Sequence, residues 1–209
     1  EVLPKSLRDK IAISNFKDKP WGEPASEIIK PIPGKTKTWH FKAENVHDFA
    51  FTADPSYRME TQEWNGVKAV ALVQESHASG WQDAASIAID VIKTFSNDFG
   101  MYEYPKIIVA DARDGMEYPM LTLDGGASPE YVSLLAHEIG HNWFFGMLGN
   151  NETYRAAMDE GFTQFLTAWY MNKWDSLNPI EPTTYAEKHR EQHDEPYKSV
   201  YYGYYRHAL

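Results

Sequence analysis

The stretch that decides the fold reads SPEYVSLLAHEIGHNWFFGM, at residues 128–147. Ser128, Pro129 and Glu130 are typical of a helix start. Serine caps free amides, proline suits the first helical position, and a carboxylate favours the positive end of the helix. Apolar residues then recur at helical spacing, and Gly146 supplies a stop. The sequence therefore predicts a helix from residue 128 to about residue 147.

Two histidines within this helix form the pattern His-Glu-x-x-His. Four residues of an α-helix turn through about 400°, so His137 and His141 face the same side, one turn apart. This spacing suits two imidazole nitrogens on one zinc ion at about 2.0–2.1 Å. Glu138 stands one position along and can reach a water molecule on that ion, where a carboxylate can act as general base.

A catalytic zinc ion needs a third protein ligand and an open position. After His141 and eighteen further residues comes Glu160, inside a second predicted helix at about residues 154–173. The alternative is a chance pattern in a packed helix, and three fixed positions match at random with a probability of roughly a few per cent. Charged residues also seldom lie on an apolar helix face without a partner. We therefore predict one zinc ion per chain, bound by His137, His141 and Glu160.

Three motifs agree in order and spacing with a known pattern: Gly115-Met116-Glu117-Tyr118, His137-Glu138-Ile139-Gly140-His141 and Asp159-Glu160-Gly161-Phe162. Together they resemble the M1 family of zinc aminopeptidases, which belongs to the gluzincins. The family pattern is Gly-x-Met-Glu-Asn, then His-Glu-x-x-His, then eighteen residues and a glutamate. The resemblance covers about residues 36–175.

The resemblance implies an enzyme that hydrolyses the N-terminal bond of peptides with a free N-terminus. Glu117 is implied to bind the substrate α-amine, and a carboxylate fixed near the metal suits that task. Gly115 and Met116 are implied to lie against the peptide backbone, as an edge strand does. Glu138 is implied to be the general base.

The sequence departs from the family pattern at four positions. Asp114 and Tyr118 replace a glycine and an asparagine of the first motif, and Asp159 replaces an asparagine beside the third ligand. Thr167 stands where many members carry an acid, so we expect other residues to orient the histidines. The resemblance places the oxyanion-stabilising tyrosine beyond Leu209. We therefore expect a piece of a longer protein, which is inactive by itself.

The resemblance also implies an α+β, thermolysin-like fold with a mostly antiparallel sheet. We expect strands within 36–53, at 67–74 and at 106–110, an edge strand at 120–123 and a helix over 81–95. The loop 115–117 is expected near the edge strand, with the two zinc helices packed below the sheet. Residues 1–57 are expected to be the tail of an N-terminal β domain. Residues 58–209 would be the catalytic domain, truncated at its C-terminal end, with the family's C-terminal helical domain missing.

Composition argues against several other classes. The 209 residues include 20 Lys+Arg, 30 Asp+Glu and no cysteine, with 43% hydrophobic residues and a formal net charge of −10. The apolar content argues against disorder, and the lack of cysteine excludes a disulfide scaffold, a thiolate metal site and a cysteine nucleophile. The acidic balance argues against a nucleic-acid partner. No run approaches the roughly 18 apolar residues of a membrane helix, so we expect no transmembrane segment.

Three other functions stay open at this point. An endopeptidase of thermolysin type would cleave N-acetylated peptides as readily as free ones. A non-catalytic M1-like module would bind peptides or another protein and would hold no stoichiometric zinc. The same residues are also compatible with epoxide hydrolysis.

Overall fold

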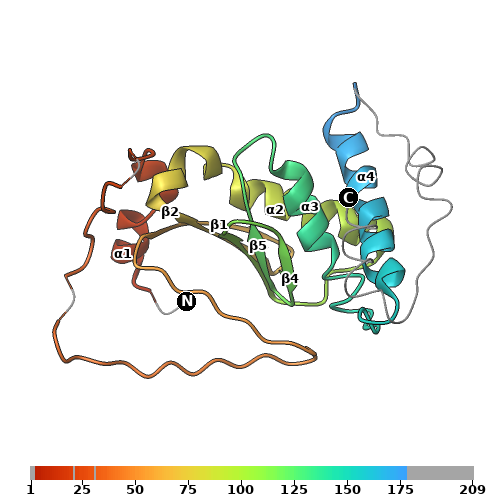
Figure 1. Cartoon of the computed structure of the whole chain (residues 1–209), viewed down its shortest axis with the longest axis horizontal. Helices are drawn as coiled ribbons and strands as arrows, with labels where there is room; N and C mark the ends of the chain where they lie inside the picture. The colour runs from red at the N-terminus through yellow and green to blue at the C-terminus, as the bar shows by residue number, and fades with distance from the viewer. Residues whose placement is uncertain (1–2, 21, 31, 178–209) are drawn as a thin grey trace.

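The computed structural model of the chain describes residues 3–20, 22–30 and 32–177 (Figure 1). Its centre is a five-stranded sheet of order β1-β2-β3-β5-β4, with α2 (Ala84–Phe99) and α3 (Val132–Gly140) packed against it. Helix α4 (Phe162–Trp174) packs on α3 and α2 (Figure 1). The strands are β1 (Tyr57–Trp64), β2 (Val67–Gln74), β3 (Lys106–Asp111), β4 (Met116–Tyr118) and β5 (Leu121–Asp124). The α+β class predicted from the sequence is confirmed.

The sheet is mixed, and the prediction of a mostly antiparallel sheet is wrong. Strands β1 and β2 form an antiparallel hairpin, as do β4 and β5, but β2–β3 and β3–β5 are parallel pairs. The hairpin turn is Asn65-Gly66, where both residues have positive φ, as a tight two-residue turn requires. The parallel β2–β3 pair arises because the connection between them contains α2, which is long enough to carry the chain back across the sheet.

Two of the predicted strands are confirmed, and a third lies elsewhere in the sheet. Strands β2 and β3 match the predictions at 67–74 and 106–110. Alternate residues of β2 are buried, which fits a strand with one face on the core. Strand β5 matches the prediction at 120–123, but it lies between β3 and β4 rather than at an edge. Strand β4, which carries Met116 and Glu117, is the edge strand.

Helix α2 (Ala84–Phe99) covers β1 and β2. It begins three residues later than predicted for 81–95 and extends to Phe99, where Gly100 with a φ of 130° ends it. Its buried face includes Ile87, Val91 and Phe95. This apolar face joins the sheet to the helices that carry the candidate site.

The helix with the two histidines, α3 (Val132–Gly140), is shorter than the prediction of 128–147. Ser128 does not cap it, because its hydroxyl donates to Asp83 Oδ2 at 2.6 Å, and Tyr131 OH donates to the other oxygen of Asp83 at 2.8 Å. These contacts hold the expected first turn against α2 instead. At the other end the chain turns sharply after His141.

The second predicted helix, at 154–173, consists of two parts. A π-helical turn, η3 (Ala157–Gly161), leads directly into α4 (Phe162–Trp174). The π turn contains Glu160, and such turns are frequent at functional sites.

The segment before β1 forms α1 (Lys5–Lys10) and the 3₁₀ turn η1 (Ile13–Asn15), and the strands predicted within 36–53 are absent. Those residues run as an extended excursion from the body of the molecule (Figure 1, orange), with exposed aromatic side chains. Strand β1 begins at Tyr57, the predicted boundary. That residues 1–57 belong to a separate β domain stays a prediction.

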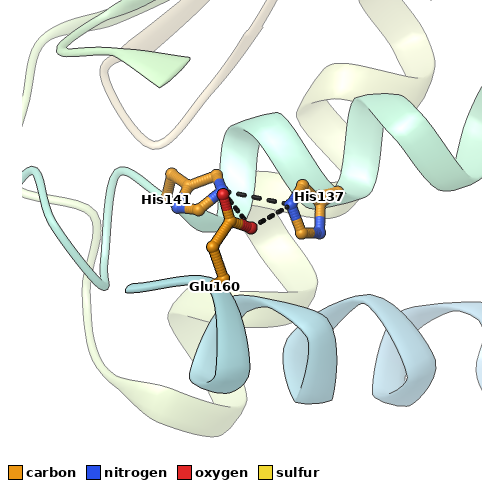
Figure 2. A group of neighbouring side chains, drawn as sticks. All are labelled: His137, His141 and Glu160. Carbon is orange, nitrogen blue, oxygen red and sulfur yellow. Dashed lines mark hydrogen bonds and ion pairs between the residues drawn. The ribbon is translucent and has the colours of Figure 1, made fainter. Parts of the chain in front are cut away.

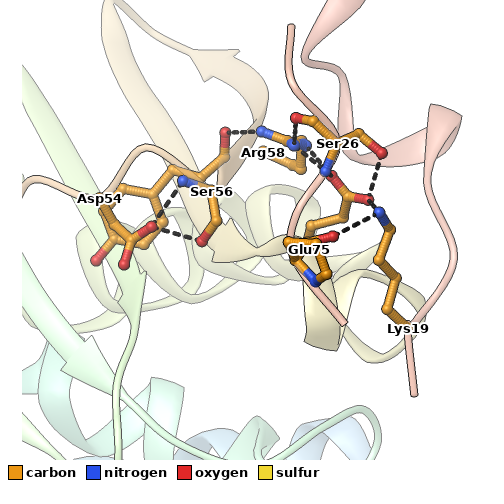
Figure 3. A network of polar contacts seen from close by, with 8 residues as sticks. Lys19, Ser26, Asp54, Ser56, Arg58 and Glu75 are labelled. Atoms are coloured by element: carbon orange, nitrogen blue, oxygen red, sulfur yellow. Dashed lines mark hydrogen bonds and ion pairs between the residues drawn. The ribbon is translucent and has the colours of Figure 1, made fainter. Parts of the chain in front are cut away.

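A buried ion pair ties the early segment to the sheet (Figure 3). Arg58 on β1 pairs with Glu75, which begins the 3₁₀ segment η2 (Glu75–Trp81), and both side chains are almost fully buried. The same carboxylate accepts hydrogen bonds from Ser26 N at 3.0 Å and Ser26 Oγ at 2.8 Å and pairs with Lys19 at 3.0 Å.

In the described part of the chain, no helix has the length and apolar character to cross a membrane.

Candidate metal centre

The structure brings His137, His141 and Glu160 together (Figure 2). His137 lies in the last turn of α3, His141 directly follows that helix, and Glu160 projects toward both from η3. The Nε2 atoms of the histidines are 3.1 Å apart. Glu160 Oε2 is 3.1 Å from Nε2 of His137 and 3.6 Å from Nε2 of His141. A group of residues able to hold a metal ion is therefore present where the sequence predicted one.

The three separations fit one tetrahedral ion. Ligand atoms about 2.0–2.2 Å from a tetrahedral zinc ion lie roughly 3.3–3.6 Å from each other. The distances of 3.1, 3.1 and 3.6 Å in this group bracket that range. Two imidazoles and a carboxylate are also a donor set that zinc uses in catalytic sites.

Hydrogen bonds on the far side of each ring decide which nitrogen can bind a metal. Thr167 Oγ donates to Thr163 O at 2.8 Å, so its lone pairs face His137 Nδ1, 3.2 Å away. Asp159 Oδ1 lies 2.5 Å from His141 Nδ1. Both Nδ1 atoms can therefore keep their protons when a metal ion binds, and the ion would replace the proton on each Nε2.

These two contacts correct one expectation. The threonine at 167 was expected to leave the orientation of the histidines to other residues, yet Thr167 itself contacts His137. Asp159, the substituted neighbour of Glu160, holds His141. Because the Thr167 hydroxyl donates to Thr163 O, its oxygen can accept a hydrogen bond from His137 Nδ1.

Burial and close contact shift the pKa values of all three residues. Burial would raise the pKa of Glu160, but hydrogen bonds from His137 and His141 lower it well below its usual range. Burial lowers the pKa of His137. Burial also opposes a charged His141, but its hydrogen bonds to Asp159 and Glu160 outweigh this and raise its pKa. The carboxylates of Asp159 and Glu160 thus favour positive charge at His141.

Close packing of α3 on α4 makes this convergence possible. A Cβ atom on Gly140 would lie 3.2 Å from Thr163 Cγ2 and 3.4 Å from Leu166 Cδ1. Glycine therefore lets the two helices approach closely at the level of the ligands. Leu135, Ile139 and Leu166 are fully buried beside this contact and hold it by apolar burial.

Glu138 lies beside the three ligands, buried and partly unpaired. Glu138 is 5% exposed, and its Oε2 atom has no hydrogen-bond partner among the described residues. Burial raises its pKa well above the usual value, although the nearby His141 opposes this. A buried carboxylate oxygen without a partner is costly, which indicates that it faces a ligand.

Gly115 passes directly over this carboxylate. A Cβ atom at that position would lie 2.0 Å from Glu138 Oε1 and 2.6 Å from its Cδ. Only glycine fits there without moving the carboxylate. The resemblance implied that Gly115 lies against the substrate peptide. In the structure, Gly115 lies against Glu138.

Glu117 and Met116 lie on the edge strand β4. Oxygens of Glu117 and Glu138 and a nitrogen of His141 are all within 4.8 Å of one another. Burial raises the pKa of Glu117, and the charges of Asp159 and Glu160 add to the increase. The outer edge of β4 pairs with no other strand in the described residues, so it is open to an extended chain.

Two acids near the site were not identified from the sequence. Glu152, in the loop before η3, forms a group with Glu117 and Asp159, and burial followed by their charges raises its pKa to about 7. Asp124, at the end of β5, is fully buried, and burial raises its pKa to about 7. Neither belongs to a motif, and no spacing signal could have found them.

Comparisons with known proteins add nothing to these observations. No protein-family model matches the chain, and no curated protein matches it significantly. The resemblance to a peptidase family therefore stays a prediction from three short motifs.

Proposed function

We propose that this chain carries the catalytic site of a zinc-dependent aminopeptidase of the M1 type. The observation that supports this most directly is the convergence of His137 Nε2, His141 Nε2 and Glu160 Oε2, at 3.1 to 3.6 Å from one another. The unpaired carboxylate of Glu138 beside them adds the acid–base group that peptide hydrolysis needs.

A zinc ion at this site would lower the pKa of water and polarise the substrate carbonyl. Glu138 accepts the proton from the attacking water, because its Oε2 atom has no other partner among the described residues. It then delivers that proton to the nitrogen of the departing amine. Gly115, packed on Oε1, keeps the carboxylate in place during both transfers.

Residues of β4 position the substrate. Glu117 holds the free α-ammonium of the substrate, and the open edge of β4 pairs with the peptide backbone. Because Glu117 lies within 4.8 Å of Glu138, a held amine leaves room for only one residue before the scissile bond. This is the feature that favours an aminopeptidase over an endopeptidase.

The substitution Glu138→Gln tests the proposal. It removes the proton acceptor while keeping the size of the side chain and all three ligands. We expect turnover to fall by 10³-fold or more, with one zinc ion still bound per chain. Metal content is measured on residues 1–209. Turnover is measured on the intact protein.

Glu130→Gln is the matched control, because Glu130 is an exposed glutamate at the other end of the same helical region. It should leave both zinc content and turnover unchanged. A fully active Glu138→Gln variant would refute the assignment. Equal cleavage of free and N-acetylated peptides by the wild-type chain would instead favour an endopeptidase.

A further inference from the structure

Glu152 is a carboxylate that the proposed mechanism does not use. It lies in the turn between His141 and η3, and it is half-buried. One oxygen each of Glu152, Glu117 and Asp159 lie within 4.8 Å of one another. The group therefore joins the proposed amine-binding strand to the loop that precedes the third ligand.

The three acids have little positive charge to balance them. Among the described residues, no lysine or arginine pairs with any of them, and the one cationic partner is His141, at Asp159. Burial raises the pKa of both Glu117 and Glu152, and the charge of Asp159 adds to the increase at each of them. Glu138 and Glu160 lie close to these three acids. A single divalent ion therefore does not neutralise the five carboxylates together.

A second observation points to a ligand in the same place. Glu138 is 5% exposed, its Oε2 atom has no partner in the described part of the chain, and its carboxylate is within 4.8 Å of Glu117. A buried carboxylate with an unpaired oxygen thus lies directly beside one member of the acidic group. The three acids are not a solvated surface cluster.

We propose that Glu152 is a second substrate-binding carboxylate, which holds the α-ammonium group of the peptide together with Glu117. This rests on the proposed function. Two acceptors about 2.8 Å from one ammonium nitrogen lie roughly 4.6 Å apart at a tetrahedral angle. The Glu117–Glu152 separation, at most 4.8 Å, suits this arrangement. Asp159 is bonded to His141 Nδ1 and shares a hydrogen bond with Glu152, which places the Glu152 carboxylate beside Glu117.

The test compares two peptides in the Glu138→Gln background, where peptide binds without being cleaved. The probes are leucyl-glycyl-glycine and its N-acetylated form, titrated calorimetrically into the zinc-loaded intact protein. Glu152→Gln removes the charge and keeps the shape. We expect it to raise the Kd of the free peptide roughly 10- to 100-fold, as loss of a charge-assisted hydrogen bond does, and to leave the Kd of the acetylated peptide unchanged.

Matched variants separate the possible roles. Glu63→Gln, at an exposed site on β1 at the opposite edge of the sheet, should leave both Kd values unchanged. Glu152→Asp keeps the charge but shortens the reach, and we expect an intermediate Kd for the free peptide. Zinc content should stay at one ion per chain in every variant.

Four results would overturn the inference or its premise. If Glu117→Gln weakens binding of the free peptide but neither Glu152 variant does, Glu152 has no such role, and the proposed function stands. If both peptides weaken equally in Glu152→Gln, the residue supports the fold. A second zinc ion, lost in Glu152→Gln, would make the group a metal site. If the acetylated peptide binds as tightly as the free one in the parent and Glu117→Gln changes nothing, amine recognition itself fails, and the aminopeptidase proposal fails with it.

Discussion

Adding one methyl group at Gly115 should disable the site while leaving the fold nearly intact. The new Cβ would lie 2.0 Å from Glu138 Oε1, whereas contacts of Cβ atoms below 3.0 Å are essentially never seen. The carboxylate must therefore move by at least 3.0 − 2.0 = 1.0 Å. The φ of Gly115 is not in the left-handed region, so Gly115→Ala causes no backbone strain.

The displaced atoms are the end of a flexible side chain, so the cost in free energy of unfolding should be about 1 kcal/mol, at the low end for overpacking. A shift of about 1 Å in a catalytic group can cost about 10²-fold in rate, and we expect kcat to fall by that factor. Urea unfolding and steady-state kinetics on the intact protein measure the two effects.

The control is Gly149→Ala, because a Cβ atom there meets nothing within 4 Å. It should change neither stability nor kcat. A Gly115→Ala variant with wild-type kcat and unchanged zinc content would refute the reasoning, since Glu138 could then move without consequence.

Two further predictions concern the support of the site and of the fold. Thr167→Val removes the hydroxyl that faces His137 Nδ1. The affinity for zinc should fall about 10- to 100-fold, as measured by competition with a chelator. An unchanged affinity would show that the hydroxyl does not orient His137. Burial would raise the pKa of Glu75, but hydrogen bonds from Ser26, Arg58 and Lys19 lower it to about 2. A carboxyl with a lowered pKa stabilises the fold above its unfolded value of 4.5, and this stability is lost as the pH falls toward 2. Glu75→Gln should therefore lower the free energy of unfolding by about 3–5 kcal/mol at neutral pH. It should also weaken the loss of stability between pH 4.5 and 2, which urea unfolding at several pH values measures. A variant whose stability falls with pH as steeply as that of the wild type would contradict this prediction.

The sequence was most informative where the signal is local. The largely apolar run of β2 and the helical spacing of α2 each depend on neighbouring residues, and both elements lie close to their predicted bounds. The positions of His137 and His141 follow from helix geometry alone. Glu160 required the second helical segment to pack against the first, which the close contact at Gly140 provides.

The remaining features depend on distant parts of the chain. Ser128 has the sequence of a helix cap, but it bonds to Asp83, which is 45 residues away. The parallel pairs of the sheet depend on how α2 crosses it, which no strand pattern encodes. Residues 36–53 have strand-like composition but pair with no strand in the described structure. Glu152 lies at the site through its contacts with Asp159 and Glu117, which the sequence around it does not encode.

The central claim is that His137, His141 and Glu160 bind one zinc ion. Zinc K-edge X-ray absorption, combined with metal analysis of the purified chain, tests this most directly. The account predicts one zinc ion per chain, about four N and O ligands at roughly 2.0–2.1 Å with two of them imidazoles, and loss of the ion in His141→Ala. A chain that retains no zinc after equilibration with the metal, or an ion whose surroundings are unchanged in His141→Ala, would contradict it.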